Sequence, residues 1–193
     1  GYIVTGQNSS GYPNTEFWEW DQASGNWTQK TDFPGGSKTG AAGFAIGNKG
    51  YIVTGQNSSG YPTKEFWEWD QTSGNWTQKT DFPGGSKTGA AGFAIGNKGY
   101  IVTGQSSSGY PTTEFWEWDQ TSGIWTQKTN FPGGSKTGAA GFAISNKGYI
   151  VTGQNSTGYP TTEFWEWDQT SGNWAQITNF PGGSKTGAAG FAI

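Results

Sequence analysis

Apolar residues alternate with small or polar residues along most of the chain, and no segment keeps a helical spacing. In "AAGFAI", residues 41–46, Ala42, Phe44 and Ile46 fall on one side, while Gly43 and Ala45 fall on the other. Alternation with a period of two is typical of β-strands, whereas a helix needs apolar residues recurring about every 3.6 positions. The pattern therefore predicts an all-β protein.

The alternating pattern is organised into units with a period of 49 residues. The units span 1–49, 50–98, 99–147 and 148–193, and the first two differ only at Asn14/Thr63, Thr15/Lys64 and Ala23/Thr72. The few differences fit both recent duplication in a natural gene and a segment of an engineered array. No linker interrupts the period, so we expect a single repeat array over residues 1–193. Since residue 1 is Gly, we expect a processed or excised segment.

Each unit predicts four antiparallel strands joined by turns. In the first unit the turns contain Asn, Gly and Pro, which favour tight reversals of the chain. The predicted strands are residues 2–6, 15–21, 27–33 and 41–46, and the two longer loops are residues 7–14 and 34–40. Four strands in about 50 residues is the size of one propeller blade.

The unit resembles a kelch repeat. Kelch repeats carry a hydrophobic strand that ends in a Gly pair, then an aromatic residue, then a Trp six residues further on. Here "YIVTG" supplies the strand with Thr5 in place of the first Gly, Trp20 stands for the usual Tyr, and six residues separate it from Trp27. The resemblance implies a kelch-like β-propeller of four blades per chain, with repeated aromatic residues packing one blade against the next. The repeat markers are Trp20, Trp27, Trp69, Trp76, Trp118, Trp125, Trp167 and Trp174.

The two ends of the chain are complementary under this resemblance. "AAGFAI" becomes the innermost strand of a blade, yet the chain starts on a second strand and ends on an innermost one, residues 188–193. Pairing the two ends would hide both free strand edges. A head-to-tail dimer closing an eight-bladed ring is the preferred prediction, because bulky aromatic residues on both faces of the third strand suit a larger ring. A closed four-bladed monomer is the alternative.

The composition limits the chemistry that the chain can perform. It has 34 Gly and 12 Trp, no Cys, Met or His, and a net charge of −3, and all of its basic residues are Lys. Without Arg a nucleic-acid partner is not expected, and without His or Cys there is no catalytic triad, thiolate ligand or ordinary zinc site. We therefore expect no enzyme activity and no cofactor. No apolar run reaches the roughly 20 residues that membrane insertion requires. A natural chain of this kind is compatible with an extracellular or cell-surface location.

The stretch "EFWEWDQASGNW", from residue 16, concentrates acids and tryptophans. Glu19 and Asp21 lie two positions apart on one strand face, which is the raw material of a glycosidase carboxylate pair. The pair occurs in all four units, whereas an active site needs one asymmetric set of roles. We therefore favour a structural interpretation, with Glu19 hydrogen-bonded in a half-buried position and Asp21 capping the following turn.

A ligand site, if present, is predicted on the loops "QNSSGYP" and "FPGGSKTG", which the strand order places at one rim. Amide, hydroxyl and phenol groups suit neutral carbohydrate, and repeated copies add avidity; ordinary turn chemistry is the alternative. The function predicted is thus a non-catalytic, self-assembling scaffold or protein-interaction propeller, with a multivalent carbohydrate-binding module as the alternative. The rim candidates are Gln7, Asn8, Tyr12, Lys38, Gln56, Asn57, Tyr61, Lys87, Gln105, Tyr110, Lys136, Gln154, Asn155, Tyr159 and Lys185.

Overall fold

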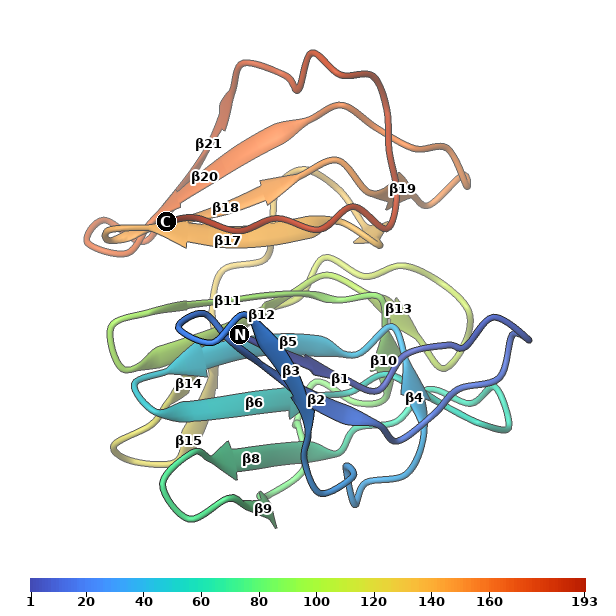
Figure 1. Cartoon of the computed structure of the whole chain (residues 1–193). Coiled ribbons are helices and arrows are strands. Elements are labelled where there is room, and N and C mark those ends of the chain that lie inside the picture. The colour runs from blue at the N-terminus through green and yellow to red at the C-terminus, as the bar shows by residue number, and fades with distance from the viewer.

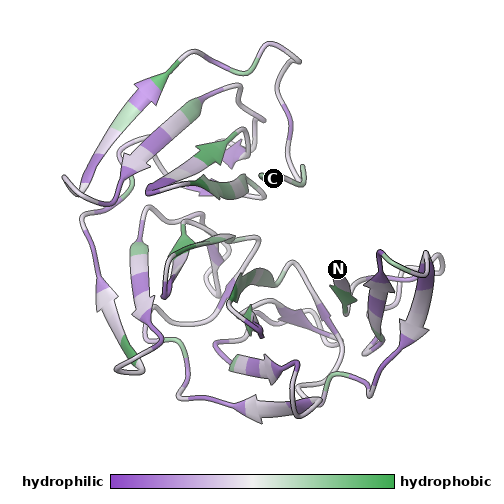
Figure 2. Cartoon of the chain, turned by 60° about the vertical axis from the view of Figure 1, so that its left-hand side comes forward, coloured by the Kyte–Doolittle hydropathy of each residue, from purple (hydrophilic) through white to green (hydrophobic).

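The computed structural model describes residues 1–193, which form antiparallel β-sheets and no helix (Figure 1). Three of the larger sheets have four strands and the first has three. These four blades follow one another along the chain and form an open arc, with the two termini on either side of its opening (Figure 2). The prediction of an all-β, propeller-like repeat fold is therefore confirmed.

Each blade is a simple meander whose strands pair with their neighbours in the chain. Blade 1 contains β1 (Tyr2–Val4), β2 (Phe17–Asp21) and β3 (Asn26–Gln29). Blade 2 contains β5 (Ala42–Ile46), β6 (Lys49–Val53), β8 (Phe66–Asp70) and β9 (Asn75–Gln78). Blade 3 contains β11 (Ala91–Ile95), β12 (Lys98–Val102), β14 (Phe115–Asp119) and β15 (Ile124–Gln127). Blade 4 contains β17 (Ala140–Ile144), β18 (Lys147–Val151), β20 (Phe164–Asp168) and β21 (Asn173–Ile177).

Short two-stranded ladders join the loops of consecutive units, and the sequence pattern did not predict them. They pair β4 (Lys38–Thr39) with β7 (Gln56–Asn57), β10 (Lys87–Thr88) with β13 (Gln105–Ser106), and β16 (Lys136–Thr137) with β19 (Gln154–Asn155). The two loop types therefore do lie together at one end of each blade. Their backbone is ordered by hydrogen bonds and not only by turn residues.

The outer strand is shorter than residues 27–33, the predicted range. β3 ends at Gln29, and the chain then bends so that Phe33 leaves the sheet and is 1% exposed. Its ring packs edge-on against Trp67 and Trp76 of blade 2, with centroids 5.5 and 4.9 Å apart. Burial of a large aromatic side chain against the next blade ends the strand here.

Aromatic side chains fill the space between blades. Phe66 packs against Trp118 and Trp125 of the next blade, with ring centroids 5.0 and 5.2 Å apart. The same contacts recur with nearly the same spacing from Phe17 and from Phe115. Trp118 is accordingly 2% exposed, whereas its counterpart Trp20, which has no such Phe packed against it, is 36% exposed.

The innermost strands approach one another closely around the centre of the arc. A Cβ atom added at Gly92 would lie 2.8 Å from the carbonyl oxygen of Gly43, so only glycine permits this spacing. The backbone N–H of Gly89 donates to the carbonyl of Gly40 at 2.7 Å, and that of Gly138 donates to Gly89 at 2.8 Å. The contacts between blades 2 and 3 thus repeat between blades 3 and 4, which indicates the same rotation at both boundaries.

The ends of the arc have unpaired edges. β1 pairs with β2, and its other edge has no strand partner within the chain. The C-terminal segment Gly187–Ile193 forms no strand, yet Gly187 donates to the carbonyl of Gly138 at 2.7 Å and Gly190 lies against Ala140 and Phe142. The innermost strands β5, β11 and β17 lie side by side in this order. The C-terminal segment continues the series and lies beside β17.

Candidate functional site

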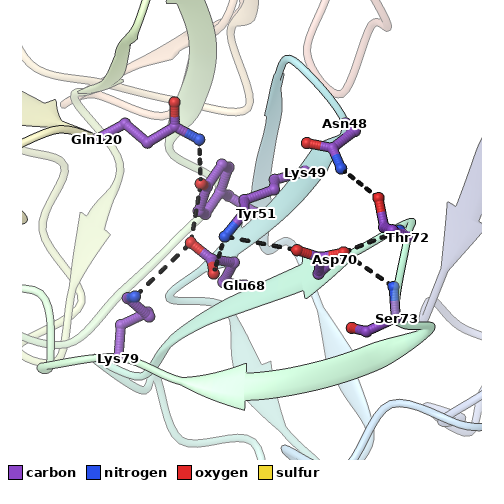
Figure 3. Close-up of polar contacts among 9 residues, drawn as sticks. All are labelled: Asn48, Lys49, Tyr51, Glu68, Asp70, Thr72, Ser73, Lys79 and Gln120. Carbon is purple, nitrogen blue, oxygen red and sulfur yellow. Dashed lines mark hydrogen bonds and ion pairs between the residues drawn. The ribbon is translucent and has the colours of Figure 1, made fainter.

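The repeated acidic pair lies in a network of hydrogen bonds that spans two blades (Figure 3). Register places Tyr51 of β6 opposite Glu68 of β8, and the tyrosine hydroxyl donates to the Glu68 carboxylate at 2.9 Å. The ammonium of Lys49 lies 2.7 Å from the other carboxylate oxygen, and that of Lys79 lies 3.7 Å from the oxygen that accepts from Tyr51. Gln120 of blade 3 donates to the Tyr51 hydroxyl at 2.9 Å. The network therefore ties neighbouring blades together.

The environment of Glu68 favours its charged form. Burial alone would raise the pKa of this carboxyl group, but hydrogen bonds from Lys49 and Tyr51 outweigh burial and bring the pKa below its ordinary value. A general acid needs the opposite shift, so that it keeps its proton near neutral pH. Desolvation by burial also raises the pKa of Tyr51. The acid and the tyrosine are thus held as a fixed carboxylate and a fixed hydroxyl.

The second acid of the pair caps a turn. One carboxylate oxygen of Asp70 accepts hydrogen bonds from the backbone N–H groups of Thr72 and Ser73, at 2.8 and 3.0 Å. These bonds, led by that from Ser73, hold the pKa of Asp70 below its ordinary value. Both structural roles expected for the pair are present, and no group of three or more acidic residues in the chain lies close enough together to hold a metal ion.

At the loop rim the tyrosine of every unit is exposed, whereas the Gln and Asn side chains bond within their own loops. Asn57 accepts from the backbone N–H of Ser59 and of Tyr61, at 3.1 and 3.0 Å, and Gln56 donates to the carbonyl of Gly60 at 2.6 Å. The equivalent Gln and Asn side chains in the first and last loops make the same bonds, so these amides shape the turn. The rim tyrosines Tyr12, Tyr61, Tyr110 and Tyr159 are 70 to 73% exposed.

The expectation that the rim lysines face solvent is wrong for three of the four. Lys38, Lys87 and Lys136 are 1 to 2% exposed. Their ammonium groups lie 2.6, 2.8 and 2.7 Å from the carboxylates of Glu65, Glu114 and Glu163 in the following unit. The β4–β7 type ladders pull each lysine between two blades, and the glutamate supplies the charge that a buried ammonium needs. Lys185 is exposed.

Sequence reasoning missed these glutamates as functional residues. The available signal was internal: a Lys and, 27 positions further on in the next unit, a Glu recur unchanged at all three junctions between units. The neighbouring surface lysine, in contrast, changes from Lys30 to Ile177. A charged pair that persists while adjacent charges vary indicates a buried contact more than a solvated surface.

A groove of about 610 Å³ lies along the free edge of β1. Aromatic side chains of blades 1 and 2 line it, among them Tyr2, Phe17, Phe44 and Trp69. It occupies the place where the other three blades have their innermost strand. A second opening of about 1100 Å³ lies between the chain ends and is bordered by Trp20, Trp27, Phe191 and Ile193. None of the elements is a helix long and apolar enough to span a membrane.

Comparison with known proteins supports the fold. No protein-family model matches the chain. No curated protein matches it either. Similarity extends to 249 chains among solved structures. One is a structure of YjhT, a propeller-like protein, with a TM-score of 0.80 at 19% identity. The match covers 95% of this chain but 63% of the YjhT chain, so this chain spans less than two thirds of that protein's length. The chain therefore has a β-propeller-like fold.

Proposed function

We propose that the chain is a non-catalytic repeat scaffold whose open arc is completed by a second copy of itself, head to tail, to give an eight-bladed ring. The observation that carries the proposal is the fit between its ends. Blade 1 has a groove where an innermost strand belongs, and the C-terminal segment has the innermost-strand sequence without a blade. A strand edge left open in this way is a template for pairing with another chain.

The register of the completed blade follows from the other blades. Ala91, Gly92 and Phe93 face Val102, Ile101 and Tyr100 in blade 3, and blades 2 and 4 pair in the same way. By the 49-residue period, Ala189, Gly190 and Phe191 of one copy face Val4, Ile3 and Tyr2 of the other. Phe191 is 83% exposed in the single chain, and association buries it.

The blades are of the kelch-like type in this proposal. The spacing of Trp20 and Trp27 supports this assignment. The backbone conformation supports it as well, at the two positions where kelch repeats have a Gly pair. Thr54 and Gly55 both have positive φ, 64° and 97°, and the same holds in the other units. A left-handed conformation at two successive residues accounts for a Gly pair, and Thr is tolerated here at a cost.

A non-catalytic role rests on the state of the acidic groups. The Glu68 and Asp70 type carboxylates are engaged by lysines, tyrosines or backbone N–H groups and have lowered pKa values, as do their counterparts in every blade. An acid–base pair needs groups whose pKa values are pushed apart. The fourfold network instead supports a framework role.

The solution mass tests the assembly. Light scattering coupled to size-exclusion chromatography should give twice the chain mass of 20.6 kDa, about 41 kDa, over a range of concentrations. A mass of 20.6 kDa at micromolar concentration would contradict the proposal. A series of larger species would indicate that the head-to-tail contact does not close and forms open filaments.

The exposed tyrosines favour a second candidate function, multivalent binding of neutral glycans at the rim. Each is held on a loop whose shape is fixed by an internal Gln hydrogen bond, together with Asn bonds in three units and a Ser106 bond in the third unit. A rigid aromatic plane repeated around a rim suits weak stacking on sugar rings, strengthened by avidity. Glycan-array binding that is lost when Tyr12, Tyr61, Tyr110 and Tyr159 are all changed to Ala would support it, and an array without signal would exclude it.

A further inference from the structure

Three buried lysines mark the boundaries between blades, and each has the same set of partners. Lys87 donates to the hydroxyl of Thr112 at 3.1 Å and forms its ion pair with Glu114 at 2.8 Å. Lys38 and Lys136 contact the equivalent Thr63 with Glu65, and Thr161 with Glu163. Each ammonium is therefore neutralised by a glutamate carboxylate. It also donates a hydrogen bond to the hydroxyl of the threonine that lies two residues before this glutamate.

The fourth lysine, Lys185, has its backbone in place but lacks these partners. Its N–H donates to the carbonyl of Thr161 and its carbonyl accepts from Gly153, as the backbone of Lys136 does with Thr112 and Gly104. Its side chain is exposed and forms no ion pair. The half of the site contributed by its own chain is thus already formed.

The first unit holds the missing half. Glu16, the counterpart of Glu65, is exposed and forms no ion pair. Two residues before it, Asn14 replaces the threonine found in the other units, and its Oδ1 atom is buried without any hydrogen-bond partner. A buried acceptor without a donor is costly and needs an explanation. The threonine hydroxyl at this place accepts from a lysine in every completed boundary.

We propose that Lys185 of a second copy inserts its ammonium between Asn14 Oδ1 and the Glu16 carboxylate, and that this buried contact specifies the head-to-tail seam. This inference rests on the self-assembly proposed above and names the contact that directs it. The 49-residue period also places Lys185 and Thr186 opposite Asn8 and Gln7 of the second copy, as the β10–β13 ladder pairs Lys87 with Ser106 and Thr88 with Gln105. Backbone pairing and charge neutralisation then occur at one place.

A second copy is a better occupant than the chain's own C-terminus. Within the chain the arc is open (Figure 2). Lys185 and Glu16 are both exposed and form no ion pair with each other. Closing four blades on themselves would require a different rotation at all three boundaries, yet the Phe–Trp centroid distances at these boundaries are 5.0, 5.0 and 4.9 Å. Close-packed aromatic contacts of this kind resist a continuous change of angle. A second copy meets the seam without altering them.

Paired charge reversals test the contact. Glu16→Lys places two lysines at each seam, and Lys185→Glu places two acids there, so each variant alone should have a dimer dissociation constant raised about 30-fold or more. A one-to-one mixture should regain the dimer mass, because a heterodimer has one original and one reversed pair. Both residues are exposed in the single chain, so circular dichroism and thermal unfolding should show folded blades in each variant.

Matched controls reverse an exposed pair within blade 2. Lys64→Glu and Asp81→Lys make the same changes in charge at an ion pair of 3.3 Å whose side chains are 57% and 40% exposed. These variants should dimerise like the original chain. If the original chain has a mass of 20.6 kDa, the assembly itself is wrong. If it dimerises and Glu16→Lys and Lys185→Glu do so equally well, or if their mixture fails to recover, only the seam contact is wrong.

The Asn14 acceptor is tested separately. Asn14→Thr restores the residue of the other units and should preserve the dimer, whereas Asn14→Val has the same shape as Thr but no acceptor. We expect Asn14→Val to weaken association about tenfold, the effect of losing a hydrogen bond to a charged group. Equal affinities for the Thr and Val variants would overturn the assignment of Asn14 as a partner of Lys185.

Discussion

The ammonium of Lys87 lies 2.8 Å from the carboxylate of Glu114, in a pair whose two sides are unequally buried. The lysine side chain is 2% exposed and the glutamate side chain 33% exposed. Removing the glutamate therefore leaves a charge in the interior, whereas removing the lysine leaves a carboxylate that water can reach.

This inequality predicts the order of two variants. Glu114→Ala should lower the free energy of unfolding by about 2–3 kcal/mol, and Lys87→Met, which keeps most of the buried stem, by about 1 kcal/mol. Guanidinium chloride unfolding followed by tryptophan fluorescence measures both. Equal losses, or a larger loss for Lys87→Met, would contradict the burial seen at this boundary.

The Glu68 network predicts a loss of stability in acid. The pKa of Glu68 in the folded chain lies below its ordinary value of 4.5 because the bonds from Lys49 and Tyr51 outweigh burial, which acts in the opposite direction. A lowered pKa contributes stability that is complete above 4.5 and is lost as the pH falls through the folded-state value. Glu68→Gln should therefore make the decline between about pH 5 and pH 3 shallower.

Urea unfolding at a series of pH values provides the measurement for that variant. The control is Asp81→Asn, which removes an exposed carboxylate outside the network and should leave the slope nearly unchanged. A slope that is the same for Glu68→Gln and the original chain would show that this carboxyl group does not have a lowered pKa.

At the buried position of Thr103, we expect a glycine substitution to leave the protein more stable than an alanine substitution. Its φ is 61°, its side chain is fully buried, and its hydroxyl has no hydrogen-bond partner. Left-handed backbone costs a residue with a Cβ atom about 1–2 kcal/mol, so Thr103→Gly should be more stable than Thr103→Ala by about 1 kcal/mol. Thermal unfolding of both variants measures the difference, and the reverse order would contradict the backbone conformation.

The sequence predicted the blades well because they depend on local alternation and on a period visible along the chain. It also predicted an unpaired edge at each end, since the phase of the repeat shows which strand is missing. It could not predict that Lys87 is buried, because a lysine among Gly, Ser and Thr has the composition of a surface loop. Its burial depends on Glu114 of the next unit, and only the assembled boundary brings the two together.

The rim loops show the same limit. Gln56 and Asn57 are residue types that suit a ligand site, but the sequence alone is also explained by ordinary turn chemistry. The structure turns both amides onto their own loop. The sequence does not single out Asn14, because a single Thr-to-Asn difference in a loop is not a recognisable motif. Its importance comes from its side-chain oxygen, which is buried and has no hydrogen-bond donor.

Gly99 and Gly50 occupy the same position of the repeat, but a neighbouring blade packs on Gly99 within the chain, whereas the space beside Gly50 is open. A Cβ atom at Gly99 would overlap the ring of Phe44, whereas at Gly50 the nearest atom is a Trp69 ring carbon at 3.9 Å. Gly99→Ala should therefore destabilise the single chain by about 1–3 kcal/mol. Gly50→Ala should leave the single chain unaffected and weaken the dimer, because the period places Phe191 of the second copy on Gly50.

Unfolding at low concentration and dissociation of the dimer by dilution measure these two effects separately. If Gly50→Ala dimerises like the original chain, Phe191 does not occupy the groove in the register that the 49-residue period predicts. Unchanged stability for Gly99→Ala would show that the ring of Phe44 does not pack on Gly99 at the boundary between blades 2 and 3.

A disulfide across the seam shows whether a second copy completes the arc, because the chain has no cysteine of its own. Ala42 faces Val53 and Ala91 faces Val102 in the completed blades, so Ala189→Cys and Val4→Cys in one chain should meet only where the C-terminal strand enters blade 1. Under oxidising conditions we expect a covalent dimer of twice 20.6 kDa, about 41 kDa, and far less of it for Ala188→Cys with Val4→Cys. A 20.6 kDa species with an internal disulfide, or one with both thiols free, would contradict completion of the arc by a second copy.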